Sequence, residues 1–140
     1  MIYIVRKEHF NAAHKLLNPN WSDKKNLEEF GVCSNENWHG HNYEIEVTVK
    51  GKINPESGML INLKVLSKIL KEEILDKVDH KNLNLDVPFL EGIITTTENV
   101  TIKFWGIKIR LEHARKMAQP PASLRVITAV KKVEYMMTIV

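Results

Sequence analysis

The sequence predicts an α+β fold whose elements follow the order strand, strand, helix, helix, strand, strand. Residues 2–14 and 39–53 are rich in β-branched and aromatic residues or alternate between apolar and polar ones, which is typical of strands. Two later stretches repeat apolar residues every three to four positions, as amphipathic helices do. At 140 residues the chain is long enough for one hydrophobic core, so we expect a single domain over residues 1–140.

The two N-terminal strands carry histidines on their apolar sides. From His39 to Val49 the odd positions are two histidines followed by apolar residues, and the even positions are polar, charged or glycine. Residues two apart on a strand project to the same side, so His39 and His41 lie together. By the same spacing His14 shares a side with Phe10 and Ala12.

The segments between and after these strands are less regular. Residues 18–26 are rich in turn formers and precede a short helical turn that ends near Phe30, just before Cys33. Residues 54–58 form a second turn. Asn62 is a suitable N-cap for a helix of about three to four turns with apolar positions from Leu63 to Ile74.

The C-terminal third predicts a second helix and two strands. Thr95 stands three residues before Glu98, the spacing of a capping box, and the helix would run through Ile102, Trp105, Ile109 and Leu111. The residues Leu124 to Val133 and Tyr135 to Val140 have the composition of a strand pair.

Composition limits the classes of partner and compartment. The net charge of +3 arises from 20 basic and 17 acidic residues spread along the chain, so we expect neither a nucleic-acid nor a membrane partner, whereas an anionic small molecule is compatible. The single cysteine excludes an internal disulfide framework, and residues 1–6 do not resemble a signal peptide. We therefore expect a soluble, cytoplasmic protein.

The three histidines His14, His39 and His41 are the candidate metal ligands. A hairpin-like connection brings their two strands together, and three imidazoles with a fourth position open are typical of a catalytic zinc site. The alternative is that His14 is a hydrogen-bonded core histidine and that the other two belong to a turn.

Six short motifs in order along the chain resemble the family of 6-pyruvoyl-tetrahydropterin synthases, which also contains the 6-carboxy-7,8-dihydropterin synthases of the queuosine pathway. The resemblance covers roughly Phe10 to Trp105. The motifs are Phe10-Asn11-Ala12-Ala13-His14, Phe30-Gly31-Val32-Cys33, His39-Gly40-His41-Asn42-Tyr43, Gly58-Met59, Asp79-His80-Lys81-Asn82-Leu83-Asn84 and Thr96-Thr97-Glu98-Asn99.

The resemblance implies a T-fold subunit, which is a four-stranded antiparallel sheet with two helices packed on one face. Family members assemble as homotrimers or homohexamers whose sheets close a barrel. The polar even face of the strand from His39 fits this expectation, since a continuous barrel uses that face and removes exposed sheet edges.

The resemblance also implies the chemistry of a zinc-dependent lyase in tetrahydrobiopterin biosynthesis. Such an enzyme eliminates triphosphate from 7,8-dihydroneopterin triphosphate while side-chain protons rearrange to give a pyruvoyl group. Zn²⁺ on His14, His39 and His41 would act as a Lewis acid, and Cys33 would be the base. Asp79 and His80 would form the relay that activates this thiol.

Pterin recognition is the weakest part of the match. In the family a glutamate near the C-terminus binds the pterin, and Glu134 is the only acidic residue after Glu112. The segment 106–132 departs from the family pattern. Thr96, Thr97 and Glu98 match residues that line the pterin pocket, although Glu98 is equally explained as a helix cap.

Other functions remain open at this stage. Cys33 precedes His39 by six residues, which favours the pyruvoyl-forming synthases, but a 6-carboxy-7,8-dihydropterin synthase would use the same zinc. Glu36 would allow side-chain cleavage, as in some relatives. A zinc-binding protein of this fold that has lost pterin catalysis and a hydrolase that uses zinc-bound water are the remaining candidates.

Overall fold

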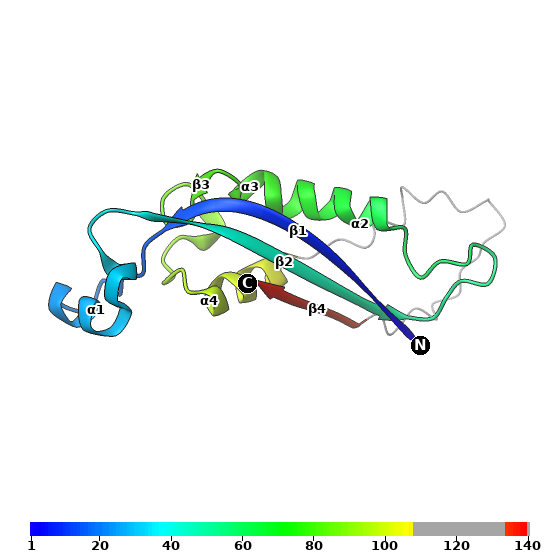
Figure 1. Cartoon of the computed structure of the whole chain (residues 1–140), viewed down its shortest axis with the longest axis horizontal. Helices are drawn as coiled ribbons and strands as arrows, with labels where there is room; N and C mark the ends of the chain where they lie inside the picture. Colours follow the sequence, from blue (N-terminus) through cyan, green and yellow to red (C-terminus); the bar gives the residue numbers. More distant parts are fainter. Residues whose placement is uncertain (108–133, 140) are drawn as a thin grey trace.

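The computed structural model describes residues 1–107 and 134–139, and its centre is a sheet in the strand order β3-β1-β2-β4. The long strands β1 (Ile2–His14) and β2 (His39–Gly51) pair antiparallel over their whole length, from Ile2 opposite Gly51 to His14 opposite His39. Strand β4 (Glu134–Ile139) pairs antiparallel with the second half of β2. Figure 1 shows the long strands β1 and β2 side by side and the shorter β4 beside β2.

The expected all-antiparallel sheet is wrong for the fourth strand. Strand β3 (Lys81–Asn82) has two residues and pairs parallel with β1 at Ala12 and Ala13, so the sheet is mixed. It forms because the chain around it bonds to Asn11: the Asp79 carboxylate accepts the Asn11 N–H, and the His80 N–H donates to the Asn11 carbonyl. So short a strand has no alternation that a sequence pattern could reveal. The strand expected over 124–133 lies outside the described residues.

The helix before Cys33 is longer than expected. Ser22 caps α1 (Asp23–Phe30), so the helix begins inside the stretch 18–26 that was expected to be loop, and it ends at Phe30 as predicted, leading into the 3₁₀ turn η1 (Gly31–Ser34). Asn62 caps α2 (Leu63–Leu70) as expected, and the helix continues through a π-helical turn, η2 (Lys71–Leu75), into α3 (Asp76–Val78). A further 3₁₀ turn, η3, spans Pro88–Leu90.

Helix α4 (Thr97–Gly106) differs from the prediction in its cap and its buried face. Thr96 is the N-cap and accepts from the Asn99 N–H, so the expected capping box between Thr95 and Glu98 is wrong by one residue. The helix buries Val100 and Phe104, whereas Ile102 and Trp105 are 66% and 52% exposed. The buried stripe therefore runs through Val100 and Phe104, four residues apart, and not through the predicted positions 102 and 105. Ile109 and Leu111 lie outside the described residues.

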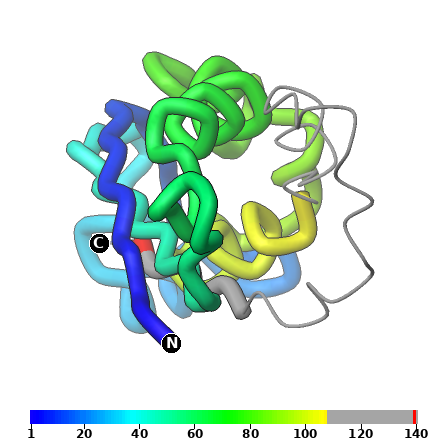
Figure 2. Tube along the Cα trace, turned by 90° about the vertical axis from the view of Figure 1, so that its right-hand side faces the viewer, coloured from blue at the N-terminus to red at the C-terminus, as the bar shows by residue number. Residues whose placement is uncertain are grey.

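The helices cover one face of the sheet, where the core lies. Figures 1 and 2 show α2, α3 and α4 on the same side of the strands. Leu66 and Leu70 of α2 and Phe104 of α4 pack in one cluster with the odd-numbered apolar residues of β2. Even-numbered residues of β1 complete this face. The alternation in the sequence therefore orients the three histidines toward the helices.

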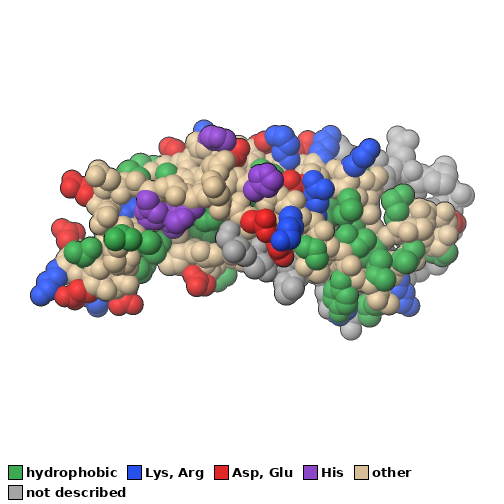
Figure 3. Space-filling view, in the orientation of Figure 1, with side chains coloured by type: hydrophobic (Ala, Val, Ile, Leu, Met, Phe, Trp, Pro, Cys, Tyr) green, Lys and Arg blue, Asp and Glu red, His purple; other side chains and the backbone are tan. Residues whose placement is uncertain are grey.

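The described residues leave the other face of the sheet uncovered. Figure 3 shows acidic and basic side chains gathered over the middle of the long strands, with hydrophobic ones toward the N-terminal end. Lys7 belongs to this face and forms ion pairs with Glu44 and Glu46. The described part of one chain forms an open sheet and not a closed barrel. No helix within the described ranges has the length and apolar character needed to cross a membrane.

Candidate metal centre

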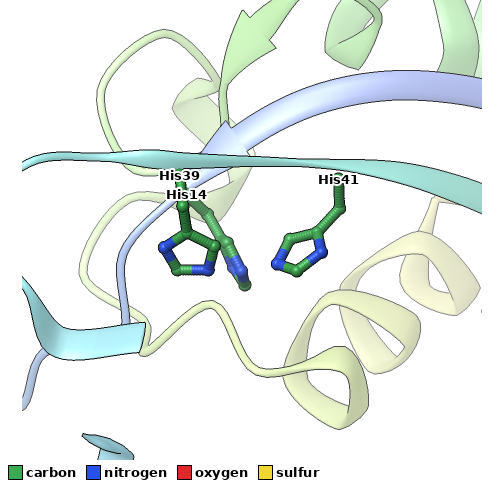
Figure 4. A group of neighbouring side chains, drawn as sticks. All are labelled: His14, His39 and His41. Atoms are coloured by element: carbon green, nitrogen blue, oxygen red, sulfur yellow. The ribbon is translucent and has the colours of Figure 1, made fainter. Parts of the chain in front are cut away.

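The three histidines meet at the paired ends of β1 and β2. The register places His14 opposite His39, and His41 opposite Ala12, so all three side chains project from the same face. Their ring centroids are 4.6, 4.8 and 4.9 Å apart, and the candidate ligand atoms lie within 4.8 Å of one another. Figure 4 shows the three rings on one side of the strands, facing a common space.

His14 is held in a defined tautomer by the backbone. Its Nδ1 lies 2.9 Å from the carbonyl oxygen of Thr95, and because a carbonyl only accepts, Nδ1 carries the proton. In the neutral ring Nε2 then has a free lone pair. Burial lowers the pKa of His14, and the nearby His39 and His41 lower it further. The hydrogen bond to Thr95 acts in the opposite direction, and the net effect favours the neutral ring.

The donor set fits a divalent metal. His14 Nε2 and both ring nitrogens of His39 are buried without a hydrogen-bond partner in the part of the chain that the structure describes. Buried polar atoms are seldom left unpaired, since doing so costs about 1–3 kcal/mol each. Three imidazoles suit zinc and similar metals, and the exposed His41 leaves one side of the cluster open to a fourth ligand.

Cys33 lies at the same end of the sheet. It belongs to η1 and is half-buried, and its carbonyl accepts the Leu16 N–H at 2.9 Å, two residues after His14. The Tyr43 ring packs edge-on against His14 and His41. Burial, with a smaller electrostatic contribution from Cys33, raises the pKa of Tyr43 to about 12.

Asp79 and His80 lie elsewhere. The Asp79 carboxylate lies 3.0 Å from His80 Nδ1 beside the outer edge of β1, and the His80 side chain is 77% exposed. His80 lines a shallow hollow of about 530 Å³, whose other lining residues are Asn11, Ala12, Ala13, Gly40, His41, Asn42, Lys81 and Asn82. Asn11 and Asn42 project from the face opposite the three histidines, whereas Ala12 and His41 belong to the histidine face. Within the described residues, neither Asp79 nor His80 forms a hydrogen bond or ion pair with Cys33 or with the three histidines.

The predicted pterin-binding residues lie in two separate places within one chain. Thr96 directly follows the residue that contacts His14, but its hydroxyl caps α4, and Thr97 and Glu98 are exposed in the first turn. Glu134 begins β4 opposite Lys50, nine positions along β2 from His41. At about 3.3 Å per residue, this separation is about 30 Å. Within one chain Glu134 is far from the cluster.

One contributor to the site carries no sign in the sequence. The Thr95 carbonyl fixes His14, yet a main-chain acceptor leaves no mark on residue type. Tyr43, by contrast, lies on the same face as His39 and His41, as the alternation in the sequence predicted.

Comparison of the sequence with known proteins identifies its relatives. A model of the 6-pyruvoyl tetrahydropterin synthase family matches residues 3–126. The 6-pyruvoyl tetrahydrobiopterin synthase of Homo sapiens is 46% identical over 102 residues, which are 73% of this chain and 70% of that protein. The protein of the same name from Dictyostelium discoideum is 47% identical over 108 residues, 74% of this chain and 76% of that protein.

A solved structure extends the likeness to the fold. The Caenorhabditis elegans 6-pyruvoyl tetrahydropterin synthase superposes with a TM-score of 0.71 at 35% identity and covers 96% of this chain and 94% of its own. The chain therefore belongs to the 6-pyruvoyl tetrahydropterin synthase family.

Proposed function

We propose that this chain is a metal-dependent 6-pyruvoyl tetrahydropterin synthase of tetrahydrobiopterin biosynthesis. It would eliminate triphosphate from 7,8-dihydroneopterin triphosphate, as a carbon–oxygen lyase acting on a phosphate ester, while the side chain rearranges to a pyruvoyl group. The observation that carries the proposal is the cluster of three imidazoles within 4.8 Å on a chain of this family.

The metal is Zn²⁺ in this proposal, held by His14, His39 and His41. When bound, it supplies a Lewis acid that polarises side-chain hydroxyls of the substrate and so acidifies the neighbouring C–H bonds. The chain's own contribution is to present three neutral imidazoles and to keep one side of the cluster open at His41.

Cys33 is the proposed base for the carbon-bound protons. Its backbone is tied to the segment that follows His14, which supports a position of the thiol beside the substrate side chain. A thiol has an ordinary pKa of about 8.5, so a neighbouring acid–base pair is needed to hold it as a thiolate at neutral pH. Asp79 and His80 are the proposed pair, with the carboxylate orienting the imidazole through their 3.0 Å contact.

Because Asp79 and His80 lie at the outer edge of β1, form no bond to Cys33 within the described residues, and expose the His80 side chain, we propose that they serve the Cys33 of a second copy of the chain. The protein would act as a homo-oligomer, a trimer or a hexamer. The uncovered polar face and the open outer edge of β1 before Ala12, within the described residues, support assembly through the sheet. Glu134 is far from the histidines of its own chain, so we assign it to the pterin site of a neighbouring copy. Thr96, Thr97 and Glu98 would line that site.

The decisive experiment is to incubate the zinc-loaded protein with 7,8-dihydroneopterin triphosphate and to identify the pterin product by mass. A pyruvoyl product with release of triphosphate is expected. A carboxy product would instead indicate a 6-carboxy-7,8-dihydropterin synthase, and a hydroxymethyl product would indicate side-chain cleavage with Glu36.

A matched variant separates catalysis from metal binding. Cys33→Ala removes the proposed base but none of the metal ligands, so it should retain one zinc per chain and lose turnover. Undiminished turnover by this variant would favour zinc-bound water as the reactive group. Stoichiometric zinc without pterin binding in the wild-type protein would favour a protein that has lost catalysis.

A further inference from the structure

The ring of His14 is supported by a loop from another part of the chain. Its Nδ1–H donates to the carbonyl of Thr95 at 2.9 Å, and the Thr95 hydroxyl lies 3.4 Å from the same nitrogen. Thr95 is 1% exposed and immediately precedes the N-cap of α4. The position of one candidate metal ligand thus depends on where this loop holds Thr95.

Thr95 is itself held by two acceptors. Its hydroxyl lies 3.3 Å from the Lys15 carbonyl and 3.2 Å from Asn84 Oδ1, either of which accepts its single proton. Lys15 directly follows His14 in the chain. The Thr95 side chain therefore connects the acceptor of the His14 ring to the backbone that carries the ring.

Asn84 completes this connection from the segment after β3. Its Oδ1 accepts the Lys15 N–H at 3.1 Å, and its Nδ2 donates to the Lys15 carbonyl at 3.0 Å. One amide side chain thus satisfies both backbone groups of the residue next to His14. Asn84 is held in turn by Asn82, whose side-chain oxygen accepts the Asn84 N–H at 3.0 Å.

We propose that Thr95 and Asn84 are positioning residues for the metal centre, which hold His14 with its Nε2 lone pair directed at His39 and His41 and thereby raise metal affinity. The inference rests on the proposed metal site. Outer-shell partners that fix the orientation and tautomer of a ligating histidine typically contribute 10–100-fold in metal affinity. Asn84 is proposed to act only by holding the backbone next to His14.

The test is the Zn²⁺ affinity of the full-length protein, measured by competition with a chromophoric chelator. Thr95→Val removes the hydroxyl at nearly constant shape, and Asn84→Ala removes both bonds to Lys15. Each is expected to weaken zinc binding by about 10-fold or more. Thr95→Ser keeps the hydroxyl and should retain most of the affinity.

Matched controls remove the same groups away from the cluster. Thr101→Val deletes a hydroxyl that donates to the Thr97 carbonyl at 2.7 Å within α4. Asn54→Ala deletes an amide oxygen that accepts the Glu56 N–H at 2.8 Å in the turn after β2. Both should leave zinc affinity within about twofold of wild type, because neither touches a residue that contacts the ligands.

A double-mutant cycle distinguishes positioning of His14 from a general loss of structure. In a His14→Ala background the two remaining histidines bind zinc more weakly, and Thr95→Val should there change the affinity by less than about twofold. An equal loss in both backgrounds, or wild-type affinity in the Thr95 and Asn84 single variants, would overturn the inference while the metal site stands. Absence of zinc binding by the wild-type protein would overturn the metal site as well.

Discussion

Tyr43 places a hydroxyl group in the core of the sheet beside the metal ligands. Its ring stacks on Phe10 at 4.8 Å and contacts two of the histidines, and its side-chain oxygen is buried without a hydrogen-bond partner in the described residues. Such an oxygen loses its bonds to water on folding and regains nothing. The ring is therefore the favourable part of this side chain for folding.

Tyr43→Phe should leave the free energy of unfolding unchanged or raise it by up to about 1 kcal/mol, since only the unpaired oxygen is removed. The measurement is chemical denaturation of the metal-free protein, which excludes effects on ligand binding. Tyr3→Phe is the control, because Tyr3 is 64% exposed. A loss of more than about 1 kcal/mol for Tyr43→Phe would show that the hydroxyl has a bonding partner after all.

Asp79 makes a pH-dependent contribution to the stability of the β1 edge. The Asn11 N–H, followed by the contact with His80, holds the pKa of Asp79 below its ordinary value of 3.8. A carboxyl group with a lowered folded-state pKa stabilises the protein above its unfolded pKa and loses that contribution as the pH falls toward the folded one. The effect is small because the side chain is 41% exposed and screened by solvent.

Asp79→Asn should therefore destabilise the metal-free protein by about 0.5 kcal/mol at pH 7. Below pH 3.8 the difference from wild type should shrink, because the wild-type carboxyl is then increasingly protonated as well. Urea denaturation at pH 7 and at pH 3 measures both values. A difference that grows in acid would contradict the assigned direction of the pKa shift.

At the scale of the element, helix α4 links the fold to the site. Thr96 caps the helix, Thr95 before it contacts His14, and Phe104 in its last turns packs in the core. The first turn of α4 thus fixes the loop on which the His14 contact depends.

Thr96→Ala should lower the free energy of unfolding by about 1 kcal/mol, because the Asn99 N–H loses its side-chain acceptor. Thermal or urea unfolding of the metal-free protein measures the loss. Thr97→Ala is the control, as Thr97 is exposed in the same turn and does not cap the helix. Equal effects of the two substitutions would show that the cap bond contributes nothing.

At the scale of the whole molecule, the parts of the proposed site lie at different places on the sheet. The three histidines lie on the helix-covered face with Cys33 at the same end, and the Asp79–His80 pair lies at the outer edge of β1 with no bond to Cys33 in the described residues. If the relay serves a neighbouring copy, no single chain contains a complete site.

Cys33→Ala and His80→Ala should each abolish most of the activity alone and regain part of it when mixed and reassembled. With random assembly at equal amounts, about a quarter of the sites receive both intact groups from adjacent copies. The measurement is pyruvoyl product formed by the mixture relative to wild type, with the separately reassembled variants as controls. No recovery in a mixture shown by mass to contain mixed oligomers would contradict a shared site.

Local pattern sufficed for the long elements. The alternation after His39 predicted β2 and the face on which His39, His41 and Tyr43 lie, and β1 ends at His14 as expected. Asn62 caps α2 as predicted, because a short polar side chain satisfies the free N–H groups of a helix start wherever the helix packs. The motifs alone also indicated the family that the comparisons show.

What the sequence by itself determined is the set of residues available for chemistry and the strand faces from which the histidines project, because both follow from neighbours a few positions apart. Only the tertiary structure decided that β3 pairs parallel with β1, that Thr95 and Asn84 support His14, and that the Asp79–His80 pair lies at the outer edge of β1. These features are contacts between segments about 70 to 80 positions apart, made largely through backbone atoms that every residue type carries, so no local pattern encodes them.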